Sequence, residues 1–281
     1  MDRRSNNTRD LSGLHGLIKA NQKLQQAVQF SIQNQSCMFH RRQLHFQNLE
    51  NHLAKRLFHL KEASKRLCIR KSGKRVCVLN FASATNPGGG VTRGSTAQEE
   101  CLCRCSTLYP CLDTETMWHQ FYQPHRKQAI HFIMMICCST PGVVIFKTDT
   151  SVPERMEEKD WYQVDIITCA APNLRKKPSN AMNPSAGNAP VKISEKALYE
   201  LQMQRLERVF QAAASNGAEV LILGAFAAAP SGNPPRIVAR AFQSVQEKYA
   251  SYFETIEYAV FCGRNNTQNY DAFNMVLGSR K

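Results

Sequence analysis

The chain has 281 residues, of which 43% are hydrophobic, so it can bury a sizeable core as one large domain or one domain with an extension. Its formal net charge of +14 favours polyanionic or phosphate-bearing partners. The number of cysteines, 11, is odd, and they lack the regular spacing of disulfide-rich domains, which argues against a disulfide scaffold. Because no apolar leader follows MDRRSNNTRD, the reducing cytoplasm is the simplest setting.

The N-terminal part of the chain is poor in helix breakers, since its first proline is Pro87. The segments 14–33 and 47–67 are rich in Gln, Lys, Arg and Leu, and we expect both to be helical. Residues 1–62 are therefore interpreted as a basic helical extension, and residues 63–281 as the main domain.

After residue 74 the chain alternates between strand patterns and helical patterns. Apolar runs predict strands at residues 75–84, 143–147, 164–172, 220–226 and 256–262. Helical patterns cover residues 196–216 and 236–249. This alternation predicts an α/β fold with a mixed, largely buried sheet. The apolar run 129–146 is short and contains Pro-Gly, so we expect a buried strand there and no membrane helix.

The stretch NPGGGVTRGSTAQEECLCRCSTLY, residues 86–109, places seven residues between three glycines and a Gln-Glu-Glu triplet. It follows a strand and leads into a helix for which Ser95 or Thr96 is the expected cap. Glycine lets backbone N–H groups approach a phosphate closely, and a helix N-terminus adds a favourable dipole. The loop is neither a Walker A motif nor a GxGxxG fingerprint.

Two carboxylates, Glu99 and Glu100, stand at the start of this helix. Adjacent like charges raise at least one pKa. A carboxyl group with a raised pKa can protonate a leaving oxygen or activate water, as glycosidic cleavage requires. The alternative is an ordinary helix start favoured by the macrodipole. The neighbouring glycine loop favours the catalytic interpretation.

With both halves of this pattern intact, the chain resembles the microbial-type poly(ADP-ribose) glycohydrolases. Their signature is a Gly-Gly-Gly followed, after a short spacer, by Gln-Glu-Glu. The resemblance continues through VDIITCAAPNL, LILGAF, GNPPRIVARAF and NYDAF, and covers roughly residues 63–277. It implies an α/β macrodomain-like mixed sheet flanked by helices, with the catalytic domain at residues 63–281 and a helical extension at residues 1–62.

The resemblance also implies roles for the first loop. Gly88, Gly89 and Gly90 would wrap the diphosphate and the distal ribose. Glu100 would protonate the departing ribose oxygen and then activate water at the anomeric carbon, while Glu99 would hold the distal ribose hydroxyls. The supporting residues would be Gln98, Ser83, Asn86 and Asn80. The implied reaction hydrolyses the ribose–ribose O-glycosidic bond of poly(ADP-ribose), and it needs no metal and no cofactor.

A second ligand loop is implied after the fourth predicted strand. Its residues are Gly224, Ala225, Phe226, Gly232 and Asn233, and near the C-terminus Phe273 would line the adenine side. For both phenylalanines, packing in the core is an equally good interpretation.

The centre of the second loop departs from the family. The family sequence is Gly-Ala-Phe-Gly-Cys-Gly-Ala-Phe. Its first three residues are retained here at 224–226, but residues 227–231 read AAAPS in place of Gly-Cys-Gly-Ala-Phe. Alanine tolerates positive φ poorly and proline lacks an N–H group, so the grip on the diphosphate is expected to weaken. The alternative function is therefore a non-catalytic ADP-ribose-binding module.

A compensated frameshift would produce this departure. Codons GGC TGC GGC GCC TTC, after loss of the first G, read Ala-Ala-Ala-Pro-Ser. We therefore expect a neighbouring frame of the gene to encode Gly-Cys-Gly at this place. A softer departure is Met134-Met135, where the family tends to carry acidic residues.

Other candidate sites are weaker. Cys101, Cys103 and Cys105 point to different sides of a helix, so they cannot share one metal ion. His119 and His125 flank a polar stretch and are expected at the surface. The implied partners are ADP-ribose, poly(ADP-ribose) or ADP-ribosylated proteins, without a membrane; a basic nucleic-acid-binding protein is the less favoured interpretation. For the basic extension, capping of the domain is favoured over attraction of the polymer or a misread sequence.

Overall fold

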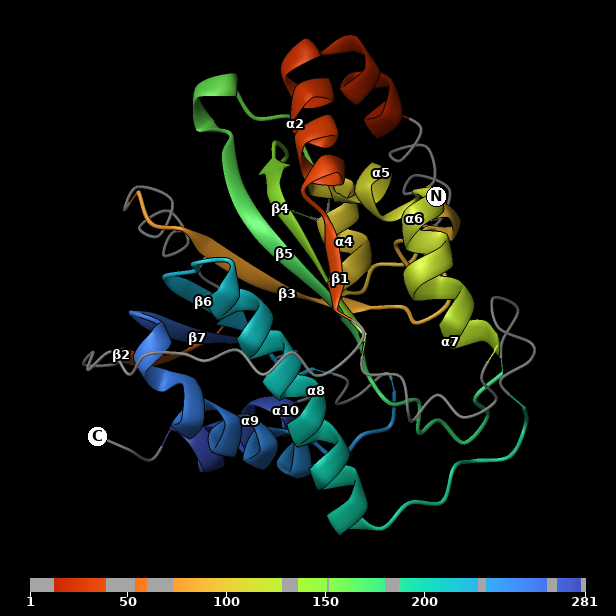
Figure 1. Ribbon diagram of the computed structural model, residues 1–281, viewed down its shortest axis with the longest axis vertical. Helices are drawn as coiled ribbons and strands as arrows, with labels where there is room; N and C mark the ends of the chain where they lie inside the picture. Colours follow the sequence, from red (N-terminus) through yellow and green to blue (C-terminus); the bar gives the residue numbers. More distant parts are fainter. Residues whose placement is uncertain are drawn as a thin grey trace.

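A computed structural model describes the chain in eight segments. They cover residues 13–38, 54–59, 73–127, 136–150, 152–179, 187–226, 231–261 and 267–278, and only the backbone is described for residues 54–59. Within these segments a single sheet runs through the molecule, with helices on both of its faces (Figure 1).

The sheet has seven strands in the order β1-β4-β5-β3-β6-β7-β2. In chain order they are β1 (Ser36–Met38), β2 (Ala54–His59), β3 (Val76–Ala82), β4 (Cys137–Ile145), β5 (Tyr162–Ala170), β6 (Val220–Leu223) and β7 (Thr255–Val260). The β1–β4 and β4–β5 pairs are antiparallel, and the other four pairs are parallel. The predicted mixed α/β sheet is confirmed, and each of the five predicted strands is present.

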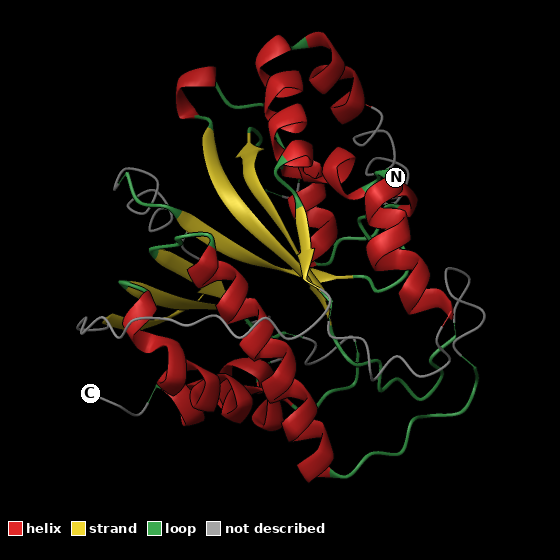
Figure 2. Ribbon diagram, in the orientation of Figure 1, coloured by secondary structure: helices red, strands yellow, loops and turns green. Residues whose placement is uncertain are grey.

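Two helical layers cover the sheet (Figure 2). One contains α8 (Glu195–Ser215), α9 (Pro235–Tyr249) and α10 (Gln268–Leu277). The other contains the helical residues 13–20, α2 (Gln22–Gln33), α4 (Gln98–Cys105) and α5 (Leu108–Leu112). Beyond α5 follow α6 (Glu115–Met117), the π-helix η2 (Trp118–Tyr122) and α7 (Gln123–Lys127). Because both faces are covered, a separate apolar core lies on each side of the sheet.

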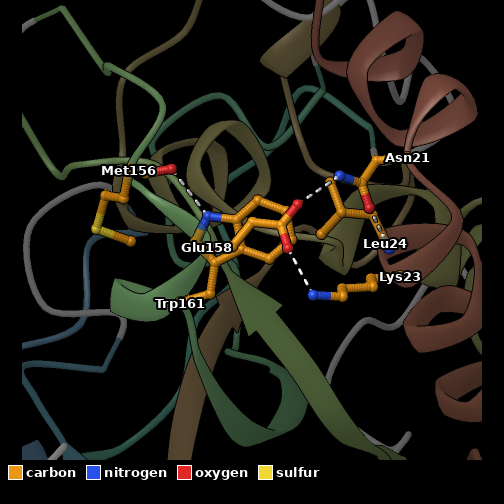
Figure 3. A network of polar contacts seen from close by, with 6 residues as sticks. All are labelled: Asn21, Lys23, Leu24, Met156, Glu158 and Trp161. Carbon is orange, nitrogen blue, oxygen red and sulfur yellow. Dashed lines mark hydrogen bonds and ion pairs between the residues drawn. The ribbon is translucent and has the colours of Figure 1, made fainter.

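The N-terminal helices are part of the second layer. Leu14 and Leu24 are buried in the core on that side of the sheet. At the start of α2, Lys23 donates to Glu158 at 2.6 Å, and the Asn21 amide donates to the same carboxylate at 3.4 Å (Figure 3). The helices therefore cap the sheet by apolar packing, with an exposed ion pair at their edge. The domain boundary at residue 62 remains a prediction.

The expected helix at residues 47–67 is wrong where the structure describes it. Residues 54–59 form β2, which pairs in parallel with β7 at the edge of the sheet. The open edge of β7 presents N–H and C=O groups that an added strand can pair with and a helix cannot. This pairing therefore outweighs the weak helical preference of the local sequence. The rest of the predicted helix lies outside the described residues.

The number and spacing of the cysteines argued against a disulfide scaffold, but the structure contains one disulfide. Cys37 and Cys138 form a disulfide between β1 and β4, where the antiparallel register places them opposite each other with 4.1 Å between their Cα atoms. Sequence spacing could not show this pair, because 101 residues separate the two cysteines.

The apolar run that ends at residue 146 contains β4, so the predicted buried strand is confirmed over its described part. Residues 128–135, which include Met134 and Met135, lie outside the description. Among the described helices, none combines the length and apolar character that a bilayer span would need.

Candidate active site

The glycine loop and the carboxylate pair meet at the carboxyl end of β3. This strand lies between β5 and β6, and it runs parallel to both. The chain leaves β3 at Ala82, turns through the glycines and the 3-10 helix η1 (Val91–Arg93), and returns in α4. The carboxyl ends of parallel strands are the usual position for a ligand in an open α/β sheet.

Gln98 fixes α4 against the strand. Its side-chain oxygen accepts from the Phe81 N–H at 2.9 Å, and its side-chain nitrogen donates to the Leu79 carbonyl at 2.8 Å. The helix begins here with Ala97 as its N-cap residue, and Ala97 has no capping side chain, so the expected caps at Ser95 and Thr96 are wrong. The bridge to β3, and not a cap, sets where the helix starts.

Glu99 is almost completely buried, with 3% of its surface exposed. It accepts hydrogen bonds from the Ser83 N–H at 2.7 Å and from the Asn80 side chain at 3.2 Å. Asn80 also donates to Thr168 on the neighbouring strand at 3.3 Å. Burial raises the pKa of Glu99 to about 8, against the lowering effect of its two donors, and the charge of Glu100 contributes least. A raised pKa in the pair was predicted, but desolvation is its main cause.

Glu100 is held at one oxygen only. Its Oε1 accepts from the Gly90 N–H at 2.8 Å. Its Oε2 is buried and has no hydrogen-bond partner among the described residues. A buried carboxylate oxygen without a partner is costly unless a ligand, a water or a proton completes it. This oxygen is therefore the group in the site that is best placed to exchange a proton with a ligand.

The glycines are required by the carboxylates. Gly88 and Gly89 have φ values of +60° and +58°, which favour glycine. A Cβ atom at Gly89 would lie 2.5 Å from Oε1 of Glu100 and 3.1 Å from Oε2 of Glu99. At Gly88 it would meet the Tyr109 ring at 2.8 Å, and at Gly90 it would overlap the Ser95 side chain. Only a backbone without side chains can pass this close to two carboxyl groups.

The turn before the glycines is held by a residue that the sequence did not indicate. Arg126 in α7 donates to the Thr85 carbonyl at 2.8 Å and to the Asn86 side-chain oxygen at 2.6 Å. Its neighbour His125 is 2% exposed, so the expected surface position of His125 is wrong. The Phe121 carbonyl lies 2.6 Å from Nδ1 of His125, and the Phe121 ring packs against the imidazole ring with 4.8 Å between the centroids.

The second loop begins within the core. A Cβ atom at Gly224 would lie 2.6 Å from the Ala259 carbonyl, so close packing against β7 requires this glycine. Phe226 is fully buried and meets the Phe81 ring edge-on at 5.9 Å. Ala225 is partly buried against the same core. The altered residues 227–230 lie outside the described segments.

The second loop ends in a buried amide network. Asn233 donates to the Pro172 carbonyl at 2.8 Å and accepts from Gln202 at 2.9 Å. The Leu174 N–H donates to the Ser231 carbonyl at 2.8 Å. Gly232 has a φ of +75°, and a Cβ atom there would lie 2.9 Å from the Leu174 carbonyl. The loops after β5 and β6 are thus joined beside the end of β3.

The remaining candidates are Phe273 and the three cysteines of α4. Phe273 is fully buried, and its ring packs against Phe242 and Tyr258, which favours the packing interpretation. Cys103 and Cys105 are buried and Cys101 is partly exposed. Across the described segments, no group of His, Cys, Asp and Glu side chains has the arrangement of a metal site.

The fold and the site together define an α/β protein in which a glycine loop passes directly over two buried, adjacent glutamates. Residues 15–148 match the family model described as microbial-type PARG, catalytic domain. Over these 134 of its 281 residues, the chain is similar to the microbial-type poly(ADP-ribose) glycohydrolase (PARG) family. Among curated proteins, none matches the chain.

Several solved structures share the whole fold. The poly(ADP-ribose) glycohydrolase from Thermomonospora curvata is 22% identical, with a TM-score of 0.77 over 97% of this chain and 99% of that one. The structure of the same enzyme bound to the inhibitor ADP-HPD is 23% identical in sequence, with a TM-score of 0.76 over 97% of this chain and 99% of that one. The poly(ADP-ribose) glycohydrolase from Deinococcus radiodurans in complex with ADP-ribose is 25% identical, with a TM-score of 0.74 over 90% of this chain and 98% of that one.

Proposed function

We propose that this chain is a macrodomain-type poly(ADP-ribose) glycohydrolase that hydrolyses the ribose–ribose O-glycosidic bond and releases ADP-ribose. The observation that carries the proposal is Glu100, whose Oε1 is fixed by Gly90 while Oε2 is buried without a hydrogen-bond partner among the described residues. The structures with ADP-ribose and ADP-HPD bound, from Deinococcus and Thermomonospora, support ADP-ribose as the ligand.

In the proposed reaction Glu100 acts twice. Its carboxyl group donates a proton to the departing ribose oxygen as the bond to the anomeric carbon breaks. Water then attacks that carbon, and the Glu100 carboxylate takes up the proton of the water. One water is consumed, and the products are ADP-ribose and a polymer shorter by one unit. The donor from Gly90 keeps the carboxyl group oriented through both steps.

Glu99 and the glycines hold the ligand in this scheme. Glu99 is itself fixed by Ser83 and Asn80, so its carboxyl group can receive the distal ribose hydroxyls without moving. The tight turn at Gly88 and Gly89 keeps the loop free of side chains, so a diphosphate can approach the backbone. No cofactor takes part in these steps.

The second candidate is an ADP-ribose-binding module without turnover. It is favoured by the sequence AAAPS at residues 227–231, where the family has glycines.

A cytoplasmic location is also part of the proposal. It is supported by seven free cysteines among the described residues, and the single disulfide weighs against it.

The two candidates are separated by incubating the full chain with poly(ADP-ribose) and measuring free ADP-ribose, with ADP-ribose affinity measured in parallel. A hydrolase releases ADP-ribose, and a variant with residues 227–231 replaced by Gly-Cys-Gly-Ala-Phe releases it faster. Saturable binding without release by either chain supports the module. Absence of both binding and release refutes both candidates.

A further inference from the structure

Arg126 lies on α7, outside the strand–loop–helix unit that carries the carboxylates. We propose that Arg126 is a positioning residue, which holds the Thr85–Asn86 turn and through this turn the glycine loop that orients Glu100. The proposal rests on the proposed function, because it concerns the same site.

The contacts of Arg126 form a two-point clamp. Its Nε donates to the Thr85 carbonyl at 2.8 Å, and its Nη2 donates to the Asn86 side-chain oxygen at 2.6 Å. The flat guanidinium group lies over the Trp118 ring, 4.7 Å from its centroid. Trp118 is fixed in turn, since its indole N–H donates to Asp113 at 2.9 Å. Both the direction and the plane of the clamp are therefore set.

A short chain of hydrogen bonds leads from this clamp to the catalytic carboxylate. The Asn86 carbonyl accepts from the Gly89 N–H at 3.1 Å. The next N–H along the chain, from Gly90, donates to Oε1 of Glu100 at 2.8 Å. Since the Cα hydrogens of Gly89 face that same oxygen, the backbone has little room to shift without moving the carboxyl group. A displaced Asn86 turn would thus be transmitted to Glu100.

The exposure of Arg126 indicates that it contributes to the alignment of the site more than to the stability of the fold. The side chain is exposed and contributes little to the apolar core. Its two donors and its stacking plane need a guanidinium group, and a lysine offers a point charge that cannot reproduce the fork. Loss of the clamp should therefore disturb the alignment of the site more than the stability of the fold.

The test compares Arg126→Lys and Arg126→Gln with a matched control, Arg155→Gln. Arg155 also lies over a tryptophan ring, 5.6 Å from the centroid of Trp161, but it is not part of the Thr85–Asn86 clamp. For each full-length chain we would measure kcat and KM for ADP-ribose release, the Kd of ADP-ribose, and Tm. Both Arg126 variants are expected to lose about tenfold or more in kcat/KM, while Tm changes no more than in Arg155→Gln.

A double-mutant cycle with Asn86→Ala measures whether the effects of the two substitutions on kcat are coupled, which a general effect of Arg126 on folding would not produce. If Arg126 acts through Asn86, Arg126→Gln costs much less in kcat in the Asn86→Ala background than in the wild type.

Full activity of Arg126→Lys would overturn the proposal, because charge alone would then suffice, and so would strictly additive losses in the cycle. If the wild type binds ADP-ribose but releases none, the hydrolase proposal fails. The Arg126 proposal is then judged on Kd, which must rise about tenfold or more in both Arg126 variants but not in the control; an unchanged Kd overturns it.

Discussion

The raised pKa of Glu99 makes the stability of the protein depend on pH in a predictable direction. Burial raises this pKa from the ordinary value of 4.5 to about 8. Between these values the folded chain holds a proton that the unfolded chain has lost. The contribution of Glu99 to stability is therefore complete below about pH 4.5 and is lost as the pH rises through about 8.

Each tenfold change in proton affinity is worth about 1.4 kcal/mol, so a pKa rise from 4.5 to about 8 amounts to about 5 kcal/mol. The substitution Glu99→Gln removes the titration and keeps the shape of the side chain. One acceptor oxygen is replaced by an NH₂ group, which faces the donor of Asn80 or Ser83 and costs a constant amount at every pH. The difference in unfolding free energy between wild type and variant should therefore shift by several kcal/mol in favour of the variant from pH 5 to pH 9.

The assay is urea unfolding of both chains at pH 5, 7 and 9 at constant ionic strength. Glu200→Gln makes the same chemical change at an exposed side chain and serves as the matched control. A difference in unfolding free energy between wild type and Glu99→Gln that stays constant with pH would show that the pKa of Glu99 is not raised by folding. So would a variant that loses stability relative to the wild type as the pH rises.

Three further substitutions test separate contacts. Gly89→Ala should lower the free energy of unfolding by about 1–2 kcal/mol because of the positive φ at this position. It should also lower the rate of ADP-ribose release far more than Gly217→Ala, a position with a similar φ where an added Cβ would have no neighbour closer than 3.8 Å. Equal losses of activity in the two variants would contradict the close approach of Gly89 to the carboxylates. Cys37→Ser should lower stability by about 2–5 kcal/mol in oxidising buffer and match the wild type in reducing buffer, as followed by Tm. Lys23→Met should leave the urea-unfolding midpoint close to that of the wild type, because its ion pair with Glu158 is exposed; a clear drop of the midpoint would show that the contact fixes α2.

The part of the site that could be predicted is local in sequence. An apolar strand run, a glycine turn and a helix start follow one another within about thirty residues, so their order alone brings Gly89 next to Glu100. The role of the glycines was only half predicted. Sequence indicated an approach of the backbone to phosphate, and the structure adds the approach of two carboxyl oxygens to Gly89.

The parts that could not be predicted depend on contacts between distant segments. Arg126 reaches the loop only because α6, η2 and α7 fold back beside it, and its sequence neighbourhood reads as polar surface. Thr168 meets Asn80 through the register of β3 and β5. The Cys37–Cys138 disulfide depends on the register of β1 and β4. No local pattern of residues encodes these alignments.

The role of Glu100 in the cleavage can be measured as the rate of ADP-ribose release from poly(ADP-ribose) by the wild type and by Glu100→Gln. Glutamine keeps the acceptor for Gly90 and cannot transfer the proton. If Glu100 transfers the proton, the wild type releases ADP-ribose and the variant is slower by about 10²–10⁴-fold, with ADP-ribose affinity preserved. Release by Glu100→Gln at the wild-type rate would contradict this role.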